Sequence, residues 1–146
     1  MKVLHLVHDV QSDASGPSYS VPMLIRSQER MGLDVHLVST KRGSKKSVIR
    51  SSKHLVFARE FDAIPLLGKL GLSVSLWNYL WRNLGQYDVV HVHGMWLLVT
   101  LYPFLLRFRG NFKIVLSPRG MLDPAALGFS PWKKKISLAC FSAIRS

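Results

Sequence analysis

Compact apolar runs alternate along this chain with segments in which apolar residues recur at helical spacing. A short apolar run bounded by polar residues is typical of a strand buried on both faces of a parallel sheet. The first such run, Val3 to Val7, ends at His8 and Asp9. By this criterion the sequence predicts strands over residues 3–7, 34–39, 55–58, 87–94 and 112–117.

Between these runs, apolar residues three or four apart and separated by polar ones are typical of helices. Val21, Leu24 and Ile25 share one face of the first such segment, which closes at Gly32. Serines at 73 and 75 are candidate caps for the second, and a proline at 131 is placed to open the last. The pattern predicts helices over 18–31, from 73 or 75 to 84, over 96–107 and over 131–145.

About five strands alternating with about four helices define the fold class as α/β. We expect a Rossmann-like, doubly wound parallel sheet occupying residues 1–146 as one domain. The pattern stops on a helix without the strand that normally follows it, so we expect the domain to be truncated.

Charge and cysteine content narrow the class of protein. Lys and Arg number 20 against 8 Asp and Glu, a formal net charge of +12. Such a surface attracts anionic partners, and a nucleic acid, an anionic membrane and a phosphorylated substrate all fit. The single cysteine, Cys140, excludes an internal disulfide and suits a reducing compartment. No apolar run approaches the ~20 residues of a membrane span, so we expect a cytoplasmic protein, peripheral at most to the inner membrane face.

Four predicted loops fall at the carboxyl ends of strands, where open parallel sheets bind ligands. They cover residues 9–19, 39–52, 93–96 and 117–124. The first contains Gly16 and Pro17 and opens a helix, whose free N–H groups suit a phosphate or a sugar hydroxyl, although a plain turn with a serine cap also fits. It matches neither the dinucleotide fingerprint nor the P-loop.

Histidines are the clearest titratable candidates. His91 and His93, two apart on one strand, point to the same face but make a weak metal pair without a third ligand. We expect His91 to be a hydrogen-bonded core residue. His93, just before Gly94, is placed to meet a ligand with its pKa near neutrality. The others, at positions 5, 8, 36 and 54, show no ligand spacing, so no metal site is predicted.

Two basic features complete the candidate chemistry. Arg119, directly after a predicted strand, is either a fork for a carboxylate or phosphate, or a turn residue paired with Asp123. Lys133, Lys134 and Lys135 beside Trp132 form either a solvated face or an anchor to anionic lipid.

In sequence, these loops resemble the N-terminal domain of family 4 glycosyltransferases, of the GT-B type that builds bacterial polysaccharides. The resemblance is carried by the first strand with Gly16-Pro17-Ser18, by the segment from Tyr87 to Trp96, and most specifically by Ser117 to Pro124 with the later Trp132-Lys133-Lys134. One departure is Gly16-Pro17 where many relatives have two glycines.

The resemblance implies two Rossmann-like domains facing across a cleft, the N-terminal one for the acceptor and the C-terminal one for the nucleotide-sugar donor. It implies transfer of a hexose with retention of configuration, without metal or other cofactor, since the nucleotide-sugar is a substrate. His93 would reach toward the donor sugar as the catalytic residue. The donor- or acceptor-binding residues that it implies are Gly16, Pro17, Ser18, Tyr19, Trp96, Arg119, Gly120 and Met121.

The donor-binding half expected of such an enzyme has no counterpart here, so we expect the chain to be inactive alone and to work with a separate C-terminal half. A non-catalytic module that binds a glycan or an anionic membrane is the alternative. Nucleic acid is not an expected partner, because no helix-turn-helix, aromatic RNA platform or zinc pattern accompanies the charge. The sequence does not specify the sugar, nucleotide, acceptor or linkage.

Overall fold

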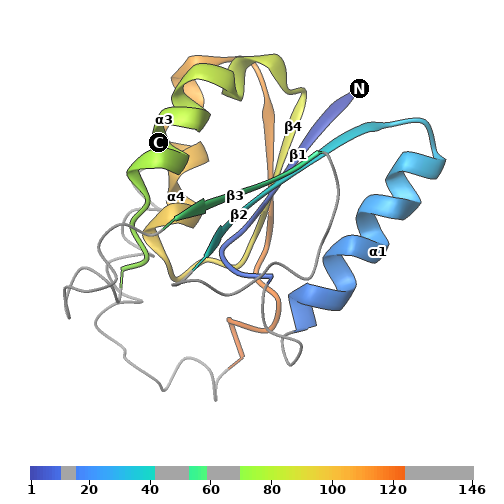
Figure 1. Cartoon of the computed structure of the whole chain (residues 1–146), viewed down its shortest axis with the longest axis horizontal. Coiled ribbons are helices and arrows are strands. Elements are labelled where there is room, and N and C mark those ends of the chain that lie inside the picture. The colour runs from blue at the N-terminus through green and yellow to red at the C-terminus, as the bar shows by residue number, and fades with distance from the viewer. Residues whose placement is uncertain (11–15, 42–52, 59–69, 124–146) are drawn as a thin grey trace.

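The computed structural model describes residues 1–10, 16–41, 53–58 and 70–123. Its centre is a sheet of five strands in the order β3-β2-β1-β4-β5, and every pairing between neighbours is parallel (Figure 1). With helices on both faces, this is the doubly wound, Rossmann-like α/β fold that the sequence predicts.

The strands lie where the apolar runs predict them, with ends that differ by a few residues. Each is short and carries valine, leucine or isoleucine on both faces, as strands buried from two sides do. The strands are β1 (Lys2–Val7), β2 (Asp34–Lys41), β3 (His54–Ala58), β4 (Val89–His93) and β5 (Lys113–Ser117).

Three α-helices connect these strands in the described residues. They are α1 (Gly16–Arg30), α3 (Val74–Asn83) and α4 (Leu98–Leu105), and the 3₁₀ turns Leu84–Gln86 and Arg107–Arg109 follow the last two. The Oγ of Ser73 accepts a hydrogen bond from the N–H of Leu76 and caps α3, which confirms the predicted start.

Two helix predictions need correction. α1 begins at Gly16, two residues before the predicted start, and α4 is shorter than the predicted 96–107. Pro103 lies inside α4 and has no N–H to donate, so the helix is weakened there and gives way to a 3₁₀ turn. The predicted helix over 131–145 and most of the loop at 39–52 lie outside the described residues.

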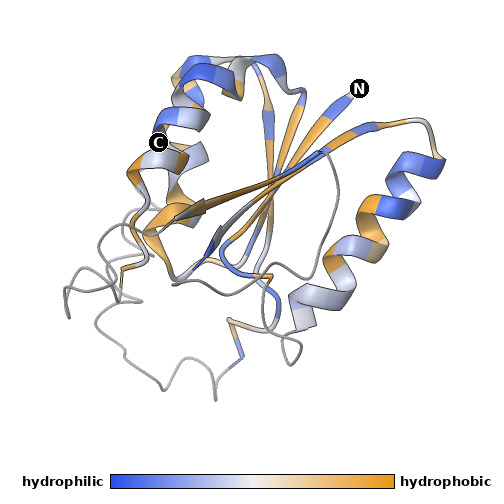
Figure 2. Cartoon of the chain, in the orientation of Figure 1, coloured by the Kyte–Doolittle hydropathy of each residue, from blue (hydrophilic) through white to orange (hydrophobic). Residues whose placement is uncertain are grey.

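The two faces of the sheet are covered differently. On one face, Leu4, Leu6 and Val92 pack with Leu76 and Leu80 of α3 and with residues of α4 in the main core cluster. On the other face α1 covers a smaller cluster of Val7, Val10, Val21 and Leu37. Figure 2 shows mainly apolar strands and an α1 that carries both polar and apolar residues.

Strand order fixes where a ligand would bind. The chain proceeds from β1 through β2 to β3 on one side and returns through β4 to β5 on the other, so the order reverses between β1 and β4. In open α/β sheets the crevice at the carboxyl ends of two such strands is the usual ligand site. In the part of the chain that the structure describes, no helix is long and apolar enough to cross a bilayer.

Candidate functional site

Three histidines from β1 and β4 meet at the point where the strand order reverses. In the parallel register His5 lies opposite His91, and Val7 lies opposite His93. Side chains two residues apart on a strand share a face, so His5, His91 and His93 all project from the face that α1 covers. His5, to which we assigned no partner, is therefore part of the site.

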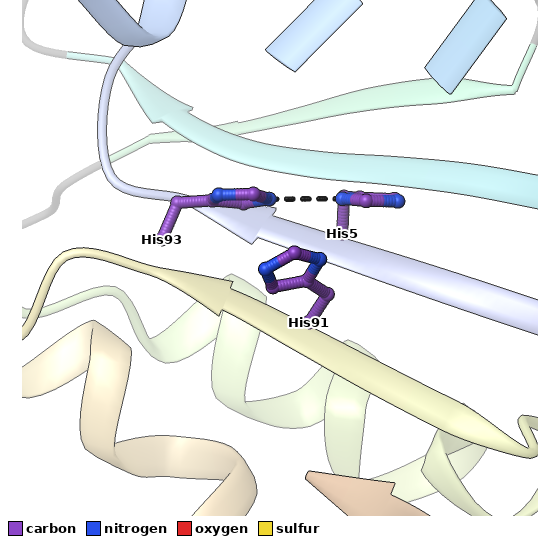
Figure 3. Close-up of side chains that lie close together, drawn as sticks. All are labelled: His5, His91 and His93. Atoms are coloured by element: carbon purple, nitrogen blue, oxygen red, sulfur yellow. Dashed lines mark hydrogen bonds between the residues drawn. The ribbon is translucent and has the colours of Figure 1, made fainter. Parts of the chain in front are cut away.

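The three rings are in contact (Figure 3). Nδ1 of His5 and Nε2 of His93 are 2.9 Å apart, and their ring planes differ by 12°, so the rings meet edge to edge. The ring of His91 stacks against that of His93 at a centroid distance of 4.1 Å and lies 5.0 Å from that of His5.

The three histidines differ in how far they are buried. His5 is fully buried and His93 is 1% exposed, whereas His91 is half-buried. Nε2 of His91 lies 2.7 Å from Oγ of Ser117 on the neighbouring strand, which confirms the expected hydrogen-bonded histidine. Nε2 of His5 lies 2.7 Å from Oε1 of Gln28 on α1.

All three rings are held neutral. Burial, followed by the proximity of His91, His5 and Arg119, lowers the pKa of His93 to about 2. Burial and the same neighbours, His5 and Arg119, lower the pKa of His91 to about 4. Burial also lowers the pKa of His5, against the opposing effect of its hydrogen bond to Gln28. The expectation of a His93 pKa near neutrality is therefore wrong, because the ring lies behind other groups and not in the solvent.

Arg119 connects this cluster to the start of α1. Its Nη2 and Nε donate to Nδ1 of His93 at 2.9 and 3.3 Å, and its Nη1 donates to Oγ of Ser20 at 2.7 Å. The Ser20 hydroxyl in turn donates to the carbonyl of Gly16 at 2.9 Å. His93, Arg119 and the first turn of α1 at Gly16 thus lie at one edge of the sheet, and the Arg119 guanidinium is directed at His93 and Ser20.

The backbone turn after β5 directs the Arg119 guanidinium toward His93. Arg119 and Gly120 both have positive φ, 55° and 75°, and the N–H of Met121 donates to the carbonyl of Pro118 at 3.1 Å. Two successive left-handed residues make a tight, type I′-like turn that sends the chain back over the sheet edge. A non-glycine residue in this region is uncommon, and here it places a cation over a buried histidine.

A family model for Glycosyltransferase Family 4 matches residues 14–144. The chain belongs to glycosyltransferase family 4. No curated protein matches it. The predicted resemblance is confirmed at the level of the family, and the function of this family 4 domain is of the glycosyltransferase type.

The remaining predicted site residues of the family 4 domain lie around the same edge. Pro17 and Ser18 are in the first turn of α1, where Ser18 is buried and the neighbouring Tyr19 is 61% exposed. Trp96 is half-buried in the segment after β4. The side chain of Met121 lies where a Cβ atom on Gly94 would meet it. The predicted membrane-facing residues, Trp132, Lys133, Lys134 and Lys135, lie outside the described residues.

The three histidines also form a potential metal site, which the sequence prediction lacked for want of a third ligand. One nitrogen from each ring lies within 4.8 Å of the other two. Nitrogen donors suit Zn²⁺ and similar ions. However, a neutral histidine that ligates through Nε2 keeps its proton on Nδ1, and Nδ1 of His93 faces the N–H donors of Arg119. The donor pattern in this family 4 domain thus favours hydrogen-bonded rings over a metal ion.

Proposed function

We propose that this chain is the acceptor-side, N-terminal domain of a GT-B hexosyltransferase that retains anomeric configuration. It would move a sugar from a nucleotide-sugar to a glycan or lipid-linked acceptor in bacterial polysaccharide synthesis. The observation that supports this most directly is the bridge that Arg119 makes between His93 and Ser20 at the reversal of strand order.

The charge at this edge suits the leaving group of such a reaction. When a nucleotide-sugar gives up its sugar, negative charge develops on a diphosphate, and fixed donors that face it lower the barrier. Arg119 is an exposed guanidinium held at two points, and the N-terminus of α1, at Gly16, adds partial positive charge beside it.

The geometry orders the roles of the two best-placed side chains. His93 is 1% exposed and lies behind the guanidinium, so the first group that a ligand meets is Arg119. We therefore assign Arg119 to the anionic part of the ligand. His93 holds Arg119 in the absence of ligand and reaches the donor sugar only when that contact opens.

We also propose the partners that the resemblance implies. The nucleotide-sugar is a substrate and no resident cofactor is required. A separate C-terminal half supplies the donor-binding residues, and the protein works in the cytoplasm at the inner face of an anionic membrane.

Ligand-observed NMR with UDP-glucose and GDP-mannose tests the binding part of this proposal. We expect at least one of the two to bind, and Arg119→Ala to weaken that binding about tenfold, because a charge-assisted bond contributes roughly 1.5 kcal/mol or more. Arg82→Ala is the matched control, since Arg82 is an exposed arginine in the last turn of α3. Equal loss in both variants would mean that net charge alone attracts the nucleotide.

Transfer itself requires a second assay. Adding the donor-binding half of a family 4 enzyme to the chain should yield sugar incorporation into a lipid-linked acceptor, whereas the chain alone should yield none. Binding of an oligosaccharide by the chain, with no sugar incorporation even when that half is present, would instead favour the non-catalytic module.

A further inference from the structure

The contacts around His93 form one continuous chain of hydrogen bonds, and its direction follows from elementary chemistry. An arginine guanidinium has five N–H donors and no acceptor. Since Nη2 and Nε of Arg119 both point at Nδ1 of His93, that nitrogen must accept and cannot carry a proton. Neutral His93 therefore carries its proton on Nε2.

The position of the His93 proton in turn determines that of the His5 proton. Nε2–H of His93 points at Nδ1 of His5, 2.9 Å away, so Nδ1 of His5 accepts and its proton lies on Nε2. That Nε2–H then donates to Oε1 of Gln28 at 2.7 Å, and a side-chain carbonyl oxygen is an acceptor. Every bond in the series has one donor and one acceptor, and none conflicts with the next.

We infer that Gln28 and His5 are positioning residues that fix the tautomer of His93 and thereby hold Arg119 over the ligand edge of the sheet. The series runs from Arg119, in the turn after β5, through His93 and His5 to Gln28, in the last turn of α1. Neither Gln28 nor His5 needs to touch a ligand for this role. Its consequence for ligand binding rests on the proposed function, whereas the assignment of the ring protons does not.

Burial makes this series strict. His5 and His93 are shielded from water. A ring nitrogen whose protonation does not match its neighbour therefore has no water molecule with which to form a hydrogen bond. Two N–H groups facing each other at 2.9 Å, or two bare nitrogens, would leave buried polar groups unsatisfied, which destabilises the folded protein. Reversal of one bond must therefore reverse its neighbours as well.

Protonation of His5 is the change that would reverse the series. A charged His5 carries protons on both nitrogens, so Nδ1–H would donate to Nε2 of His93. The His93 proton would then move to Nδ1, where it confronts the N–H donors of Arg119, and the guanidinium would have to leave. In the protein as it stands, burial and the nearby charge of Arg119 disfavour this state and outweigh the hydrogen bond to Gln28, which favours it.

The first test is the tautomer of each ring in the unmodified protein, from two-bond ¹H–¹⁵N correlation spectra of ¹⁵N-histidine-labelled chain. We expect His5 and His93 to be neutral and protonated on Nε2 across the neutral pH range. Detection of Nδ1–H on either ring would overturn the inference, with no variant required.

The second test is Gln28→Glu, which places a carboxylate beside Nε2 of His5. We expect the His5 titration midpoint to rise by about one pH unit or more. As His5 gains its proton, the His93 proton should move from Nε2 to Nδ1 and the Arg119 Nε–H signal should shift toward that of a solvent-exposed arginine. Ser27→Glu is the control, because it adds the same side chain at the neighbouring exposed position of α1.

Three further outcomes complete the design. If His5 titrates in Gln28→Glu while His93 and Arg119 stay unchanged, the rings are not coupled and the inference is wrong. If equimolar Zn²⁺ shifts all three rings of the unmodified protein and displaces Arg119, the cluster is a metal site instead. If the tautomers are as assigned but UDP-glucose and GDP-mannose bind equally to Gln28→Glu at either side of the His5 midpoint, the series exists without acting on the ligand.

Discussion

Met121 lies against Gly94, across the edge of the sheet where β4 and β5 end. A Cβ atom on Gly94 would lie 3.2 Å from the terminal methyl of Met121, and Gly94 has a φ of +91°. Its N–H also donates to the carbonyl of Ser117 at 2.9 Å. Gly94 therefore joins the turn that carries Arg119 to the end of β4, and both its backbone angle and its lack of a side chain are needed there.

Gly94→Ala should destabilise the protein by about 1–3 kcal/mol, because alanine is strained at this φ and the methionine must shift. Gly32→Ala is a matched control, since Gly32 has a φ of +80° and nothing within 4 Å of its added Cβ. Urea unfolding of both variants separates the backbone strain, which they share, from the Met121 contact. Equal losses would show that the contact with Met121 is unimportant.

The neutral histidine cluster predicts a loss of stability in acid. The ordinary pKa of 6.5 is lowered to about 4 for His91 and about 2 for His93 in the folded protein. Below pH 6.5 the unfolded chain therefore binds more protons than the folded one, and the free energy of unfolding falls as the pH falls. Above pH 6.5 both states hold the rings neutral, and this contribution is constant.

His91→Gln should flatten that dependence between pH 6.5 and 4, because it removes one of the titrating groups without changing the charge at pH 7. Arg82→Gln, which removes a surface charge and no histidine, should leave the slope as it is. Urea titrations at several pH values measure both effects. A wild-type stability that is unchanged or higher at pH 4.5 would contradict the neutral assignment of the rings.

The cap of α3 gives a prediction that is independent of the site. Ser73 is fully buried and its Oγ accepts from the N–H of Leu76 at 3.2 Å, so Ser73→Ala should cost about 1 kcal/mol. Ser27→Ala, on the exposed face of α1, should be nearly neutral. Thermal unfolding distinguishes the two, and Ser73→Thr should recover part of the loss since threonine also caps. Equal stability of the two alanine variants would exclude a role for the cap.

Features that depend on neighbouring residues were predictable from the sequence. Apolar runs located the five strands because burial on two faces requires them, and Ser73 located a helix start because its side chain satisfies a local N–H. The alternation of side chains along a strand also placed His91 and His93 on one face. Pro103 also indicates that α4 is short, because proline disfavours a helix interior. The prediction of a helix to residue 107 leaves this out of account.

His5 and Gln28 were missed because their roles depend on which strands are neighbours. His5 lies opposite His91 only since β1 pairs with β4, a relationship between residues 86 positions apart in the chain. A signal was nevertheless present: His5 stands two residues before the end of its strand, as His91 does. Gln28 likewise follows Val21 and Ile25 at helical spacing, so a polar residue occupies the stripe of α1 that faces the sheet.

The pKa of His93 was mispredicted for a related reason. Position at the end of a strand suggested contact with solvent or ligand, but the side chain of Arg119 returns from β5 and covers the ring. Only the turn at Arg119 and Gly120 brings it there, and the sequence indicated a turn without indicating its direction.

The left-handed backbone at Arg119 allows its side chain and its conformation to be tested separately. Arg119→Ala and Arg119→Gly both remove the guanidinium, and both should weaken binding of the nucleotide-sugar to the same extent. Their stabilities should differ, however, because glycine adopts a φ of 55° without strain and alanine does not. We expect the glycine variant to be more stable than the alanine variant by roughly 0.5–1 kcal/mol in urea unfolding.

Position 82 provides the reverse control, because Arg82 lies in the last turn of α3. There Arg82→Gly should be less stable than Arg82→Ala by about 0.5–1 kcal/mol, since glycine lowers helix stability. The same order of stability at both positions would mean that the backbone at Arg119 is not held in the left-handed region. A difference in ligand affinity between the two Arg119 variants would show that the turn itself, and not only the guanidinium, shapes the site.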